Sequence, residues 1–137
     1  MMGSLANAAL AAGGHVVGII PEFMMELEWG HTGLPELHVV TDIHERKRKM
    51  IQEVDAVIAL PGGSGTLEEL LEAITWRRLG LYSNPVFLLN TRRFYDPLVA
   101  LLERGVSEGF MTEGDRVWRV LSTPEELLRE LNQRRSE

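Results

Sequence analysis

The stretch AVIALPGGSGTLEELL, residues 56–71, decides the fold of this chain of 137 residues. Its first five residues are apolar without alternation, which is typical of a parallel strand covered on both faces. The residues after the turn repeat apolar positions at the helical period and predict a helix over residues 66–79. A buried strand that turns directly into a helix is the repeating unit of a parallel α/β sheet.

Strands and helices alternate through the rest of the chain. Further strands are predicted over residues 15–20, 37–41, 85–89 and 117–121, and further helices over residues 5–12, 43–54, 95–106 and 123–133. Asp42 and Thr123 stand at helix starts, where their side chains can act as N-caps. Residues 22–34 predict an irregular segment. We therefore predict an α/β fold, a three-layer sandwich with a parallel sheet, in a single domain over residues 1–137.

Composition excludes several classes of function. The chain contains no cysteine, which excludes disulfide scaffolds, thiolate metal sites and cysteine nucleophiles. The formal net charge is −6 and the basic residues occur in short clusters, which argues against a nucleic-acid surface. No apolar run approaches the roughly 18 residues of a membrane span, and the histidines lack metal-ligand spacing. We expect a cytoplasmic protein that binds no nucleic acid, membrane or metal and needs no cofactor.

The turn of residues 61–66 is a candidate cradle for an anion. In a parallel sheet, ligands bind beyond the carboxyl ends of the strands, where the following helices begin. Gly62, Gly63 and Gly65 allow positive φ and a close backbone approach, so that several amide N–H groups can converge on one anion. Thr66 can cap the helix or donate its hydroxyl to a phosphate. A tight strand-to-helix turn without a ligand is the alternative.

Two acids follow the turn, although a phosphate gains nothing from neighbouring carboxylates. They suggest a ribose hydroxyl, a water molecule or a developing cation as partners. Glu68 and Glu69 flank the apolar stripe of the helix on opposite sides. That stripe consists of Leu67, Leu70, Leu71 and Ile74. The alternative for each acid is a solvent-facing residue of the first helical turn, where it complements the helix dipole.

The helix predicted over residues 43–54 directs two cations inward. When its apolar residues form the inward stripe, Arg46 and Lys47 lie at the two margins of that stripe. Both lie near the N-terminal end of the helix, which the dipole already makes positive. An anionic partner, either a ligand phosphate or Glu69, would account for this arrangement. Snorkelling side chains on a partly buried helix are the alternative.

The sequence resembles the Lonely Guy family of cytokinin riboside 5'-monophosphate phosphoribohydrolases, long labelled lysine decarboxylases. Residues 61–69 match the family motif PGGxGTxxE, and IHERK at residues 43–47 matches MHxRK, with Ile43 in place of methionine. The stretches GGHVVGIIP, PVFLLN, FYDPL and EGF extend the resemblance over essentially the whole chain. It implies a Rossmann-like fold and a homodimer, or a higher homo-oligomer, with active sites near the subunit interface.

The resemblance implies hydrolysis of the N-glycosidic bond of nucleoside 5'-monophosphates, either AMP or a cytokinin riboside monophosphate, to the free base and ribose 5-phosphate. Arg46 and Glu69 would then be the catalytic pair. The implied substrate contacts are Glu28, Lys47, Gly62, Gly63, Ser64, Gly65, Thr66, Glu68 and Thr75. A non-catalytic Rossmann-like carrier of a nucleotide or a cofactor is the alternative.

Two further expectations concern the label and the length of the chain. Decarboxylation with pyridoxal phosphate needs a Schiff-base lysine, but Lys47 and Lys49 are the only lysines, and the chain is short for such an enzyme. Family members usually begin with a further strand, helix and strand that end in a glycine-rich turn. MMGSL matches the start of the following helix, so those elements, and with them part of the phosphate site, would be missing if the chain begins at Met1. A start site further upstream, or a truncated sequence, is the alternative.

Overall fold

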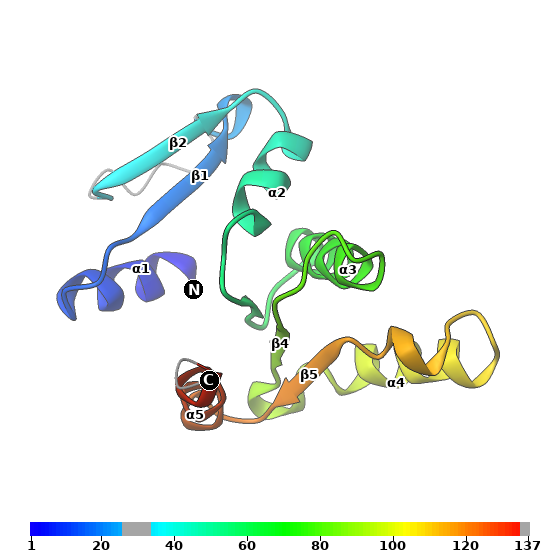
Figure 1. Ribbon diagram of the computed structural model, residues 1–137. Coiled ribbons are helices and arrows are strands. Elements are labelled where there is room, and N and C mark those ends of the chain that lie inside the picture. The colour runs from blue at the N-terminus through cyan, green and yellow to red at the C-terminus, as the bar shows by residue number, and fades with distance from the viewer. Residues whose placement is uncertain (26–33, 135–137) are drawn as a thin grey trace. The chain divides into compact units, whose positions relative to one another are not determined.

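The structure is a computed structural model that describes residues 1–25 and 34–134 (Figure 1). The chain divides into two compact units, unit 1 over Met1–Gln52 and unit 2 over Glu53–Glu137. Each unit contains its own parallel sheet. The predicted fold class, α/β with parallel strands, is confirmed.

The described residues of unit 1 form two strands, two helices and one short 3-10 turn. In chain order these are α1 (Met2–Ala11), β1 (Val17–Pro21), η1 (Glu22–Met24), β2 (Glu36–Val40) and α2 (Ile43–Ile51). The strands β1 and β2 pair in parallel, with Val17 opposite Glu36 and Pro21 opposite Val40. Helix α2 packs against both strands, so the residues on its inner face lie beside the sheet.

Unit 2 contains three strands, three helices and two short 3-10 turns within the described residues. In chain order these are β3 (Val57–Ala59), α3 (Ser64–Arg78), β4 (Val86–Leu89), η2 (Thr91–Arg93), α4 (Asp96–Ser107), η3 (Glu113–Asp115), β5 (Trp118–Leu121) and α5 (Pro124–Arg134). The strands are all parallel, and β4 lies between β3 and β5. All four residues of β4 are buried. Because successive side chains point to opposite faces, the central strand is covered on both faces, as its apolar sequence predicts.

Two predicted helix caps are confirmed. The Asp42 carboxylate accepts a hydrogen bond of 2.8 Å from the N–H of Glu45 at the start of α2. The Thr123 hydroxyl accepts one of 3.2 Å from the N–H of Glu126 at the start of α5. Each cap satisfies one of the N–H groups that lack a partner within the helix. Helix α2 is shorter than predicted, because Gln52, with φ −67° and ψ 132°, is already extended. Glu53 follows with a positive φ of 62°.

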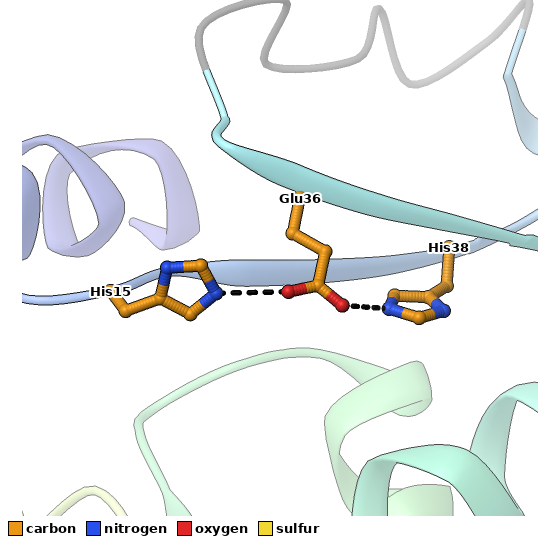
Figure 2. A network of polar contacts seen from close by, with 3 residues as sticks. All are labelled: His15, Glu36 and His38. Carbon is orange, nitrogen blue, oxygen red and sulfur yellow. Dashed lines mark hydrogen bonds and ion pairs between the residues drawn. The ribbon is translucent and has the colours of Figure 1, made fainter.

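A polar network joins the chain before β1 to β2 in unit 1. Figure 2 shows the Glu36 carboxylate between the imidazole rings of His15 and His38. One carboxylate oxygen lies 2.9 Å from Nε2 of His15, and the other contacts Nε2 of His38. These hydrogen bonds hold the pKa of Glu36 below its usual value.

Among the described residues, no group of three histidine or carboxylate side chains is arranged to hold a metal ion. In the same ranges, the helices are too short or too polar to cross a membrane.

Candidate active site

The glycine turn lies at the carboxyl end of β3 and leads directly into α3. Gly63 is the N-cap, with φ −89° and ψ −158°, and α3 begins at Ser64. The carbonyl of Gly63 accepts the first intrahelical hydrogen bond, 3.1 Å from the N–H of Leu67. The first N–H groups of an α-helix have no partner within the helix, and a glycine cap offers them no side-chain acceptor. The start of α3 is therefore suited to bind an anion, with the dipole adding favourable potential.

The three glycines of the turn matter for the space around them and not for unusual backbone angles. Gly62 packs closely against a neighbour, whereas Gly63 and Gly65 leave open space. A Cβ atom at Gly62 would lie 2.8 Å from Cβ of Thr66, closer than real Cβ contacts allow. At Gly63 and Gly65, an added Cβ would meet no atom of the described residues within 4 Å. The turn does not use the positive φ that glycine allows, because these glycines are not among the residues with positive φ. Gly63 makes the turn in an extended conformation instead.

Helix α3 begins two residues earlier than predicted, which changes the roles of the residues that follow. Thr66 is the third residue of the helix and not its cap, and its side chain lies over Gly62. Glu68 and Glu69 belong to the second turn, so the first turn contains no acid. Because the helix dipole acts mainly within the first turn, dipole compensation does not explain these two carboxylates.

The buried face of α3 consists of Leu70, Ala73 and Ile74. Leu71 was predicted in this face but is 40% exposed, whereas Ala73, which was not predicted there, is buried. Glu69 lies at the margin of the buried face and is half-buried, whereas Glu68 is exposed.

Three predicted substrate contacts, Ser64, Glu68 and Thr75, are exposed and share one side of α3 with Leu71. Their spacing of three and four residues places them in a row that starts at the glycine turn. The Thr75 hydroxyl donates a hydrogen bond of 2.8 Å to the carbonyl of Leu71. The row is accessible along its length and continues the surface of the turn.

The inward orientation of Arg46 and Lys47 in unit 1 is confirmed. Nε of Arg46 donates a hydrogen bond of 3.1 Å to the carbonyl of Ile19 in β1. Lys47 is 6% exposed and is the one buried charged residue in the part of the chain that the structure describes. Burying an ammonium group is costly unless the group is paired. Arg46 belongs to unit 1 and Glu69 to unit 2, and their pairing stays a prediction.

The remaining predicted site residue, Glu28, lies outside the described residues.

Sequence reasoning missed the segment after β4, although β3 and β4 are parallel neighbours whose carboxyl ends meet at one edge. There the hydroxyl of Tyr95 donates a hydrogen bond of 2.6 Å to the carbonyl of Leu60, the residue before the glycine turn. A polar residue directly after a buried strand, Asn90, was the available signal.

Comparisons with known proteins identify the family and relatives of this chain. A family model described as possible lysine decarboxylase matches residues 2–131. A cytokinin riboside 5'-monophosphate phosphoribohydrolase from Rhodococcoides fascians is 52% identical over 117 residues, which are 85% of this chain and 59% of the relative. Proteins of the same name from Oryza sativa subsp. japonica and Arabidopsis thaliana are 47% and 45% identical over 116 and 112 residues. Those matches cover 85% and 82% of this chain and 48% and 53% of the relatives. The chain thus spans about half the length of the relatives.

Proposed function

This chain belongs to the family described as possible lysine decarboxylase, that of the Lonely Guy proteins, and from this premise we propose that it hydrolyses nucleoside 5'-monophosphates. The bond cleaved is the N-glycosidic bond, and the products are the free base and ribose 5-phosphate. AMP and a cytokinin riboside monophosphate are the proposed substrates. Relatives that are 45–52% identical and named for this chemistry support the proposal.

The observation that carries the proposal is the passage from the glycine turn into α3. The start of the helix has no side-chain cap and suits the 5'-phosphate, and the space over Gly63 and Gly65 is open to it. Glu68 and Glu69 follow one turn later on the same helix. A ribose 5-phosphate bound with its phosphate at the turn would extend its sugar toward these carboxylates. We assign Ser64, Thr66, Glu68 and Thr75 to substrate contact on this basis.

Glu69 is the proposed catalytic carboxylate. In the reaction, water attacks C1' of the ribose, the bond to the base nitrogen breaks, and the base leaves with the electron pair and takes up a proton. Positive charge develops on the ribose ring in the transition state. The Glu69 carboxylate stabilises that charge or orients the water. Its half-buried position strengthens either effect, because electrostatic interactions are stronger away from bulk water.

Arg46 is the proposed partner of Glu69, and Lys47 and Glu28 are proposed substrate contacts. An arginine close to a carboxylate favours its ionised form, so Arg46 would keep Glu69 charged while it binds the phosphate or the ribose. The support is the inward orientation of Arg46, which the hydrogen bond to Ile19 holds in place. Lys47 follows Arg46 directly in α2 and is buried, which supports its assignment to the same anionic substrate.

We propose that the protein acts as a homodimer or a higher homo-oligomer in the cytoplasm. Large apolar side chains of unit 2 support an association surface, since Leu101 is 65% exposed and Phe110 is 80% exposed. The absence of cysteine suits a reducing compartment. Light scattering on the purified protein tests the assembly, and a monomer at micromolar concentration contradicts it.

A panel of substrates tests the proposed activity. The protein is incubated with AMP, GMP, CMP and isopentenyladenosine monophosphate, and the free bases are separated by chromatography. Release of base in equal amounts with ribose 5-phosphate is expected for at least one purine monophosphate. Retention of a nucleotide without release of base would instead identify a carrier, and the hydrolytic proposal would be wrong.

A further inference from the structure

We propose that Tyr95 is a positioning residue whose buried hydroxyl holds the glycine turn of residues 61–65 in the shape that binds phosphate. The inference rests on the proposed function and adds a residue that touches neither the substrate nor the reacting atoms. Tyr95 is 1% exposed, and its hydroxyl donates a hydrogen bond of 2.6 Å to the carbonyl of Leu60. Leu60 is the residue immediately before the PGG sequence of the turn.

The Leu60 carbonyl needs this anchor because it lies beyond the sheet. The pairing of β3 with β4 runs from Val57 opposite Val86 to Ala59 opposite Leu88 and ends there. Backbone groups past the last pair of a ladder lack the restraint that sheet hydrogen bonds provide. The hydroxyl of Tyr95 supplies a restraint at this position, one residue before the chain leaves for the turn. Its bond therefore fixes the point from which the turn departs.

Tyr95 is itself held from several sides. Its backbone N–H donates a hydrogen bond of 2.6 Å to Oδ1 of Asn90, whose Nδ2 donates one of 2.7 Å to Asp96. The N–H of Asn90 donates one of 2.7 Å to the carbonyl of Leu121 in β5. The ring of Phe94 packs edge-on against the Tyr95 ring, with centroids 5.1 Å apart. These contacts connect β5, the start of α4 and the end of β3 in one chain of bonds.

The backbone between Asn90 and Tyr95 adopts an unusual conformation. Arg92 and Arg93 have φ values of 55° and 61°, in the left-handed region that non-glycine residues avoid. Such residues persist only where the surroundings impose the conformation. Here the side chain of Asn90 bridges the segment by bonding the N–H of Tyr95. The segment thus holds a strained backbone in the conformation that places the Tyr95 hydroxyl at the carbonyl of Leu60.

The second tyrosine of the chain supplies a matched control. The hydroxyl of Tyr82 also donates to a backbone carbonyl, that of Val54 before β3, at 3.3 Å. The same carbonyl accepts a second hydrogen bond, 2.9 Å from Nδ2 of Asn84. Tyr82 is buried, at 8% exposed, and burial raises the pKa of both hydroxyls. Val54 precedes β3, whereas Leu60 follows it. Loss of the Tyr82 hydroxyl therefore removes the same kind of bond at the end of β3 away from the glycine turn.

The test compares Tyr95→Phe with Tyr82→Phe in the whole protein. Each substitution keeps the ring and removes one hydroxyl. The readouts are amide hydrogen exchange over residues 62–66, the affinity for inorganic phosphate, and kcat and KM for AMP. From the usual contribution of one hydrogen bond, Tyr95→Phe should speed exchange in the turn and raise the phosphate Kd and the KM by about 3- to 10-fold. Tyr82→Phe should leave all three values near those of the wild type, and both variants should keep kcat.

Equal exchange in the turn and equal phosphate affinity for the two variants would overturn the inference. If the wild type cleaves no nucleotide, the proposed function is wrong, while hydrogen exchange and phosphate affinity still decide the role of Tyr95. Asn90→Ala is the second variant should Tyr95→Phe fold poorly, because it keeps the Tyr95 hydroxyl and removes the bonds of the Asn90 side chain to the N–H of Tyr95 and to Asp96. Asn90→Ala should also speed amide exchange in the turn and raise the phosphate Kd. Unchanged exchange and unchanged phosphate affinity would count against the inference.

Discussion

Alanine at Gly62 and alanine at Gly63 should have different effects, although the two residues are neighbours in one turn. A Cβ atom at Gly62 would lie 2.8 Å from Cβ and 3.1 Å from Cγ2 of Thr66. Thr66 is β-branched and lies in the first turn of α3, so its side chain has little freedom to move aside. Overpacking of this kind costs about 1–3 kcal/mol. For a chain of this size, that corresponds to a fall in Tm of roughly 3–10 °C.

Gly63→Ala is the matched variant. The backbone of Gly63 is extended, and its added Cβ would meet no described atom within 4 Å. Alanine in such a conformation restricts the unfolded chain, which is worth about 0.4–1 kcal/mol. Alanine is also a poorer N-cap than glycine, by a similar amount, so the two effects on stability offset each other. The same methyl group would occupy space over the turn that we assign to the phosphate. Gly63→Ala should therefore leave the Tm near that of the wild type while it weakens the binding of AMP.

Scanning calorimetry and AMP titration calorimetry on both variants measure the two effects. A similar fall in Tm for Gly62→Ala and Gly63→Ala would refute the packing argument. Wild-type affinity for AMP in Gly63→Ala would refute the placement of the phosphate over the turn.

Three further substitutions or conditions test the local physics. Arg92→Gly should raise the free energy of unfolding by about 1 kcal/mol, because its φ of 55° strains a residue with a Cβ atom, and a lower urea midpoint would contradict this. Asp42→Ala should lower the free energy of unfolding by about 1 kcal/mol through loss of the α2 cap, and an unchanged urea midpoint would count against it. The lowered pKa of Glu36 means that its contribution to stability is present above the unfolded pKa, near 4.5, and is lost as the pH falls through the folded pKa. Replacing both His15 and His38 with glutamine should shift the Glu36 carboxyl titration, followed by NMR, back toward the ordinary value, and an unmoved titration would refute the network in Figure 2.

Local patterns in the sequence predicted the elements well. The fully apolar run of residues 85–89 predicted a strand covered on both faces, and every residue of β4 is buried. The helical period of residues 43–54 predicted that Arg46 and Lys47 point inward, and they are half-buried and buried. Such features depend on neighbours within a few residues, so the sequence contains the information that determines them.

The start of α3 could not be predicted from local preferences. Thr66 is a better N-cap than glycine by side-chain chemistry, and the sequence therefore favoured a start at Thr66. The chain instead turns at Gly63, because the close approach of Gly62 to Thr66 needs Thr66 already inside the helix. That constraint is one of packing between residues of the turn, which propensities do not report.

The contact of Tyr95 with Leu60 joins residues that are 35 positions apart. Its existence depends on the adjacency of β3 and β4 and on the left-handed residues of η2. A sequence pattern predicts neither the adjacency of these strands nor the left-handed residues. It does predict the helix start at FYDPL, which has proline in the first turn. The pairing of Arg46 with Glu69 is long-range in the same way and remains a prediction.

Comparing Glu69→Gln with Glu68→Gln tests the central claim, that the glycine turn binds the phosphate while the second turn of α3 supplies the catalytic carboxylate. The measurement is the rate of base release from AMP at saturation, together with the affinity for AMP. Glu69→Gln should keep its affinity for AMP and lose about 100- to 1000-fold in kcat, as expected when a charge that stabilises the transition state is removed. Glu68→Gln should affect KM more than kcat, because Glu68 is exposed and assigned to binding. Undiminished hydrolysis by Glu69→Gln would contradict the account.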